Sequence, residues 1–137
     1  MSKLISSSFP SLRLRRGRSR PWIRNLLTEN KLTVNDLIWP IFICDGKNKK
    51  EEISSMPNIY RYSIDGLTEI SETAENLGIN LIALFPYTPD EKKTDNAEES
   101  INSKNLVCQA LNKIKQKNNN FGVMCDIALD PYTSHGH

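Results

Sequence analysis

The chain has few of the features that mark secreted, membrane or polyanion-binding proteins. Its three cysteines, Cys44, Cys108 and Cys125, form no Cys-x-x-Cys pair and cannot all pair within one chain. Without a secretory signal, they are expected to be reduced thiols in a cytosol. No apolar run approaches the roughly 20 residues that span a bilayer, and the formal charge of +2 indicates no general polyanion partner. We therefore expect a soluble, cytoplasmic protein with no membrane partner.

The positive charge is concentrated near the N-terminus, where residues 13–24 hold six arginines and no acid. Serine, proline and glycine interrupt any helix in residues 1–21, so this segment is predicted to be an arm. The arm is either a solvated basic tail, a nucleic-acid contact or an arm that embraces a neighbouring subunit. The nucleic-acid alternative ranks last, because no aromatic residues interleave with the arginines of the arm to stack on bases.

Beyond the arm, apolar runs alternate with helical patterns. Strands are predicted at 37–44, 80–87 and 121–125, and helices at 22–30, 64–77 and 101–117. The first two strands are nearly continuous apolar runs, which indicates burial on both faces, although Pro40 predicts an irregularity in the first. Ser63 is a plausible helix N-cap and Gly78 a left-handed C-cap. The connections 45–62 and 88–100 are polar and predicted to be loops.

The order of strands and helices predicts a parallel α/β arrangement. Periodicity does not decide between a closed barrel and an open sheet. The 137 residues are short of the roughly 250 that a (β/α)8 barrel typically needs.

The final segment is dense in polar groups at the point where the third strand ends. Asp126 follows the strand, and Asp130 precedes Pro131, which biases it away from helical backbone. A loop at the carboxyl end of a parallel strand is where such folds place their chemistry. A carboxylate at Asp126 can hold an ammonium group or move a proton, or it can only cap loop amides. His135 and His137 can chelate a metal or fix the shape of the loop.

The run Cys-Asp-Ile-Ala-Leu-Asp-Pro-Tyr-Thr-Ser-His-Gly-His at 125–137 resembles the metal-site segment of the porphobilinogen synthase (5-aminolaevulinate dehydratase) family. Segments 13–16, 32–43 and 55–57 agree with it, so the resemblance extends from about Leu12 to His137. It corresponds to the front part of the family's sequence. The resemblance implies the N-terminal part of a TIM (β/α)8 barrel, with residues 1–25 as an oligomerisation arm. Residues 26–137 would then form an incomplete barrel with about the first three strands.

The resemblance also implies a function for the complete enzyme. It would be a hydro-lyase of tetrapyrrole and heme biosynthesis that condenses two 5-aminolevulinate molecules to porphobilinogen with loss of two waters. Asp126 would contact a substrate amino group. The Schiff-base lysines would lie on later strands, so residues 1–137 alone are predicted to be inactive. The partners would be further copies of the chain, with exchanged arms and no nucleic acid. The alternative is a non-catalytic, truncated paralogue that acts as an assembly module.

The metal prediction rests on two positions. Zinc-using members of the family have cysteines where this chain has Ala128 and Asp130. Alanine ligates nothing, and a carboxylate oxygen suits Mg²⁺ or a monovalent cation better than Zn²⁺. We therefore predict Asp130 as a candidate ligand of Mg²⁺ or a monovalent cation, and no zinc site of the cysteine type. The loop side chains with no assigned role are Tyr132, Ser134, His135 and His137.

Overall fold

The computed structural model describes residues 8–136, and the chain divides into two compact units, Met1–Leu32 and Thr33–His137. The first, the N-terminal unit, holds a 3-10 turn at Arg16–Arg18 and the short helix α1 (Pro21–Leu26). Pro21 suits the first turn of α1, where a backbone N–H has no intrahelical partner. The helix was expected to reach residue 30, but it ends at Leu26, four residues early. Leu26 and Leu27 are exposed, so no packing extends it.

The second unit is built on a mixed sheet of five strands in the order β2-β3-β1-β4-β5. Its centre is β1 (Trp39–Ile43), β4 (Leu81–Pro86) and β5 (Gly122–Cys125), which are parallel neighbours. These are the three predicted strands, each within two residues of its expected bounds. They run in the order that a (β/α) barrel requires, and β5 is an edge of the sheet.

Two short strands lie where the sequence predicts only a loop. The first, β2 (Lys50–Glu52), is antiparallel to β3 (Tyr60–Tyr62), and β3 is parallel to the end of β1. Strands of three residues are too short to carry a periodic signal, so pairing with the sheet makes these segments extended. Strand β3 pairs with β1 only at Phe42 and Ile43. Pro40 lies outside this pairing, so its missing N–H costs no hydrogen bond to β3.

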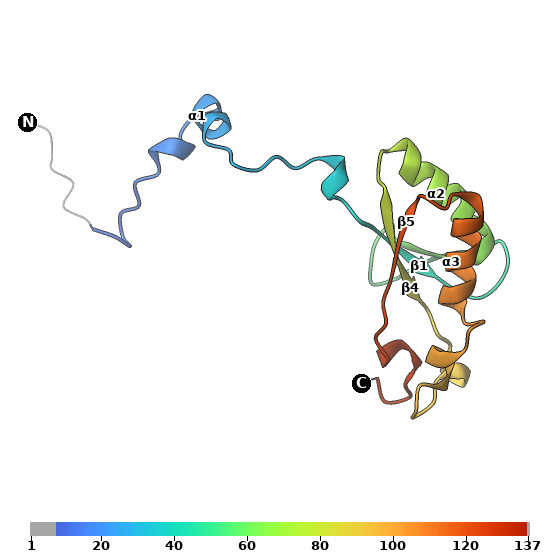
Figure 1. The fold of residues 1–137 in the computed structure, drawn as a ribbon. Coiled ribbons are helices and arrows are strands. Elements are labelled where there is room, and N and C mark those ends of the chain that lie inside the picture. Colours follow the sequence, from blue (N-terminus) through green and yellow to red (C-terminus); the bar gives the residue numbers. More distant parts are fainter. Residues whose placement is uncertain (1–7, 137) are drawn as a thin grey trace, which may run out of the picture. The chain divides into compact units, whose positions relative to one another are not determined.

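Helices α2 (Leu67–Asn76) and α3 (Leu106–Lys117) lie beside each other against one face of this sheet (Figure 1). Between them and the sheet lies the core: Ile41, Ile43, Leu67, Ile70, Ala74, Ile82, Leu84, Leu106, Val107, Ala110, Ile114 and Phe121. Each large aliphatic side chain buried here contributes about 1.5–3 kcal/mol. Across residues 8–136, neither these helices nor α1 are long and apolar enough to cross a membrane.

The helix ends differ in part from the sequence prediction. Gly78 has a φ of 77° and ends α2 as predicted. Ser63 does not cap the helix, because its hydroxyl accepts from the Lys49 N–H at 2.8 Å and a 3-10 turn at Ile64–Gly66 precedes α2. Helix α3 begins five residues later than predicted, where the Asn105 side chain accepts from the Cys108 N–H at 2.8 Å.

The opposite face of the sheet, here called the open face, carries no helix in the part of the chain that the structure describes. Strand alternation and register place on it Pro40, Phe42, Ala83, Phe85 and Met124. Phe85 and Met124 are exposed, and the Phe42 and Phe85 rings lie 5.7 Å apart. The predicted burial of both faces in the first two strands is therefore wrong for Pro40 and Phe85, which are exposed, whereas Ala83 is buried as predicted. The face toward α2 and α3 is the more deeply buried of the two.

Gly122 of β5 has no room for a side chain. A Cβ there would lie 2.8 Å from the Asn80 carbonyl oxygen and 2.9 Å from the Leu81 side chain. Gly122→Ala is therefore expected to lower the free energy of unfolding by about 1–3 kcal/mol in urea titrations. Gly66→Ala is the matched control, because its Cβ would meet nothing closer than 3.9 Å. Equal destabilisation by the two substitutions would contradict this account of β5.

Candidate functional site at the carboxyl edge of the sheet

The connections that follow β4 and β5 are tied together at the carboxyl edge of the sheet. We call this contact, made by Thr94, Asp95, Tyr132, Thr133 and Ser134, the loop clasp. Thr94 and Thr133 form a parallel bridge, in which the Thr94 N–H donates to the Tyr132 carbonyl at 3.1 Å and the Ser134 N–H to the Thr94 carbonyl at 3.2 Å. The Ser134 hydroxyl also donates to the Asp95 carboxylate. The clasp gives the polar segment after β5 a defined position.

Asp126 is exposed at the start of that segment. Its Oδ1 accepts the Ala128 N–H at 3.0 Å, so the carboxylate orders the following turn. It is also the next residue with the strand parity of Met124, one step beyond the pairing of Leu84 with Cys125. Asp126 therefore caps a loop amide, as one of the two sequence interpretations predicts, and it also lies at the carboxyl edge of the sheet.

A pocket of about 300 Å³ lies beside Asp126. It is lined by Ser100, Asn105, Val107, Cys108, Leu111, Cys125, Asp126, Ile127, Ala128, Leu129 and Tyr132. Burial raises the pKa of the Cys125 thiol and that of the Tyr132 phenol. Both groups therefore hold their protons at neutral pH, and Cys125 packs against the core as the small apolar residue that the sequence predicts.

Asp130 is exposed and starts a 3-10 turn, Asp130–Tyr132, with Pro131 in its first turn. The expected departure from helical backbone at Asp130 is therefore wrong, since a proline in a first turn needs no N–H partner. Residues 8–136 contain no group of three or more His, Cys, Asp or Glu side chains that could hold a metal ion. Asp130 alone does not make a metal site.

The other predicted loop residues are brought together in part. Tyr132 and Thr133 are buried, whereas Ser134 and His135 are exposed. Ser134 and Tyr132 join the clasp, His135 makes a further contact, and His137 lies outside the described residues. Sequence reasoning missed Asp95 and Asn105, because single polar residues in a polar connection carry no signal of their partners.

The first connection of the sheet also contributes charge to this edge. Asp45, which follows β1, pairs with Lys92 from the connection after β4 at 2.6 Å. The Arg61 guanidinium lies 4.6 Å from the centre of the Tyr87 ring. Thus β1, β3, β4 and β5 all place ionisable or aromatic side chains at the same edge.

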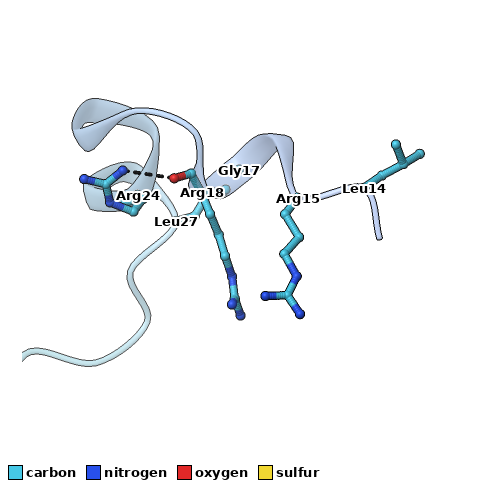
Figure 2. A pocket seen from close by; sticks show the side chains of 6 residues that line it. All are labelled: Leu14, Arg15, Gly17, Arg18, Arg24 and Leu27. Atoms are coloured by element: carbon cyan, nitrogen blue, oxygen red, sulfur yellow. Dashed lines mark hydrogen bonds between the residues drawn. The ribbon is translucent and has the colours of Figure 1, made fainter. Parts of the chain in front are cut away.

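The N-terminal unit has a pocket of its own, of about 580 Å³, lined by Leu14, Arg15, Gly17, Arg18, Arg24 and Leu27 (Figure 2). The Arg24 guanidinium donates to the Arg18 carbonyl at 2.9 Å. In the view of Figure 2, Arg15 and Arg18 extend to the same side of the segment. The arginine-rich arm is thus locally folded around a cationic surface.

These features define a class. Three parallel strands with helices on one face, and polar residues gathered where the strands end, are the beginning of a (β/α)8 barrel with its site at the carboxyl edge.

The comparisons identify the family. The family described as delta-aminolevulinic acid dehydratase matches residues 11–137. The enzyme of that name from Bradyrhizobium diazoefficiens is 49% identical over 127 residues, covering 93% of this chain and 36% of its own length. The one from Chlamydia pneumoniae is 42% identical, covering 97% and 40% respectively. The chain belongs to the delta-aminolevulinic acid dehydratase family.

A solved structure agrees on the fold. The Toxoplasma gondii ME49 enzyme, also named porphobilinogen synthase and solved with its reaction product porphobilinogen, superposes with a TM-score of 0.81 at 34% identity. That match covers 92% of this chain and 36% of the Toxoplasma chain. The predicted fold, a part of a TIM-type barrel, is confirmed. This chain spans about 36–40% of the length of these relatives.

The loop clasp generates a prediction about local stability. Ser134→Ala removes the hydroxyl that donates to Asp95, so the Thr94 and Ser134 amides are expected to exchange with solvent about tenfold faster, a loss of roughly 1–1.5 kcal/mol. Hydrogen exchange measured by mass spectrometry checks this. Ser103→Ala, at an exposed serine, is the control. Unchanged protection at residues 94 and 134 would show that the backbone bridge suffices.

Tyr132 generates a prediction about alkaline stability. Its raised pKa means that the unfolded chain loses the phenol proton first, so stability falls as pH rises above about 10. Tyr132→Phe is expected to make this fall shallower in urea titrations between pH 9 and pH 11. An unchanged slope would mean that other groups, such as the Cys44 and Cys125 thiols with their raised pKa values, account for all of it.

Proposed function

We propose that the full-length product of this gene is a porphobilinogen synthase that condenses two 5-aminolevulinate molecules with loss of two waters. The observation that carries the proposal is the family match, which runs through residues 11–137 and includes the whole segment after β5. The Toxoplasma relative, solved with porphobilinogen, has the same arrangement over this region. The barrel position of that segment supports the proposal, since barrel enzymes work at the carboxyl edge of their strands.

In this proposal Asp126 holds the amino group of one substrate molecule. A carboxylate exposed at the end of β5, with one oxygen already fixed by the Ala128 N–H, has a defined orientation. It can accept a proton from an ammonium group or keep that group charged and in place. Tyr132 and Ser134 act through the loop clasp, which positions the segment that carries Asp126.

The reactive lysines of the proposed mechanism lie outside this chain. A lysine that forms a Schiff base needs a lowered pKa. At the carboxyl edge, the pKa of Lys92 is raised by its bond to Asp45, and that of Lys93 by its bond to Asp90. Lys115 and Lys117 are held at the end of α3 by carbonyl oxygens and by Glu72. The raised pKa values of Lys92 and Lys93 favour their charged, unreactive form.

We also propose Mg²⁺ or a monovalent cation as cofactor, on the donor type alone. Asp130 offers oxygen and Ala128 offers nothing, and the described residues do not form a complete site. No chemical step is assigned to the ion.

The proposal extends to assembly and compartment. The N-terminal unit exposes Leu14, Leu26 and Leu32 beside its arginines, a composition suited to binding another copy of the chain. The free thiols Cys44, Cys108 and Cys125 suit the reducing cytosol. Removal of residues 1–25 from the full-length protein is the corresponding test of oligomer size.

The function is tested on the full-length protein. It should convert 5-aminolevulinate to porphobilinogen, and borohydride should trap labelled substrate on it but not on residues 1–137. Asp126→Asn is expected to lower kcat by about 10²- to 10⁴-fold. The control is Asp90→Asn, which removes only an exposed ion pair with Lys93. No trapping on the full-length protein would reject the function. A reading frame that stops after His137, with a folded product, would instead favour the non-catalytic assembly module.

A further inference from the structure

The loop from Asp126 to Ser134 is fixed at its two ends rather than along its length. Its first end leaves β5, which ends at Cys125, and its second end is held by the loop clasp. Between them Ile127 is 93% exposed and Leu129 is also exposed, so packing of these side chains does not fix the path of the loop. The orientation of the Asp126 carboxylate therefore depends on the geometry of the clasp.

Thr94 is the residue through which the connection after β4 holds this loop. Its backbone N–H donates to the Tyr132 carbonyl at 3.1 Å, and its carbonyl accepts the Ser134 N–H at 3.2 Å. Its hydroxyl oxygen accepts the Glu98 N–H at 3.0 Å, within its own connection. Thr94 thus bonds to the loop through its backbone and to its own connection through its side chain.

The turn that Thr94 closes has an unfavourable backbone conformation. Ala97 has a φ of 53°, in the left-handed region that residues with a Cβ rarely adopt, and it is 1% exposed. The Ala97 N–H donates to the Thr94 carbonyl at 3.2 Å, and the next N–H, of Glu98, donates to the Thr94 hydroxyl. Such a conformation persists only where the surrounding structure imposes it. Loss of the Thr94 hydroxyl is therefore expected to relax the turn and to shift the Thr94 backbone relative to the loop.

The far side of the turn is anchored to α3. The Asn105 side chain, which is 5% exposed, accepts the Cys108 N–H in the first turn of α3 and donates to the Glu99 carbonyl at 3.3 Å. Glu99 belongs to the 3-10 turn Glu98–Ile101, which follows Ala97. Because α3 packs on the core, the Asn105 amide gives the connection after β4 a fixed support.

We propose that Thr94 is a positioning residue, which sets the orientation of the Asp126 carboxylate through the loop clasp. This rests on the proposed function, in which Asp126 holds the amino group of one substrate molecule. Thr94 acts on the reaction only through Asp126, since its hydroxyl is bonded to the Glu98 N–H. Misplacement of a reacting group by about 1 Å costs up to about 100-fold in rate, so a small shift of the loop has a measurable effect.

The test uses Thr94→Val in the full-length protein, because valine keeps the shape of the side chain and lacks the hydroxyl. Thr94→Val should lower kcat for porphobilinogen formation about tenfold. Thr94→Ser restores the hydroxyl and should return kcat to within about twofold of wild type. The matched control is Thr73→Val, which removes an exposed threonine hydroxyl that donates to the Glu69 carbonyl at 2.9 Å within α2. It should leave kcat unchanged.

A double substitution separates positioning from a general loss of structure. If Thr94 acts through Asp126, Thr94→Val should lower kcat by less than about twofold in an Asp126→Asn background. The full tenfold loss in that background would overturn the proposal, because the two effects would then be independent. Wild-type activity of Thr94→Val, or no recovery in Thr94→Ser, would also overturn it.

A second readout does not depend on activity. The Ala128 N–H donates to the Asp126 Oδ1 at 3.0 Å, so its exchange with solvent reports whether the carboxylate is held. Thr94→Val should speed exchange of the Ala128 and Ser134 amides about five- to tenfold in mass spectrometry at short labelling times, whereas Thr94→Ser should not. Unchanged exchange in Thr94→Val would overturn the role of Thr94.

The exchange measurement keeps this proposal distinct from the proposed function. A full-length protein that makes no porphobilinogen would reject the function. Exchange at Ala128 would still decide whether Thr94 orients the Asp126 carboxylate.

Discussion

The structure depends on the packing of α2 and α3 against one face of three parallel strands. Ile43, Leu84 and Ile114 are almost fully buried at this contact. Removal of these apolar side chains from water stabilises the packing of the helices on the sheet. The contact sets the height of each strand relative to its neighbours, because a slip of one residue would turn the buried set outward. It therefore also sets where the strands end, and with them the candidate site.

The site exists because separate connections meet where these strands end. Asp126 follows β5, Lys92 follows β4, and Asp45 follows β1. Far apart in the sequence, they share an edge only because parallel strands deliver their carboxyl ends together. The loop clasp then joins two of the connections through backbone as well as side-chain bonds. A loop held in this way can present a carboxylate in one orientation, which a solvated tail cannot.

The two faces of the sheet serve different purposes. The helix side is an apolar core. At its margin Lys117 of α3 is joined to α2 by an ion pair with Glu72 and a hydrogen bond to the Thr68 carbonyl. The open face carries the aromatic side chains of Phe42 and Phe85. In a closed barrel that face lies inside, where a charge unpaired by protein is costly.

The sequence alone determined the three central strands, two helices and the placement of the polar segment after Cys125. Long apolar runs and helical spacing of apolar residues are local signals, which the sequence shows without knowledge of tertiary partners. Only the tertiary structure decided that residues 50–52 and 60–62 are strands, that Ser63 bonds to Lys49, and that Asp95 meets Ser134. These contacts join residues 8 to 39 positions apart in the chain. Polar residues have no period that marks such partners, so the packed core alone brings them within bonding distance.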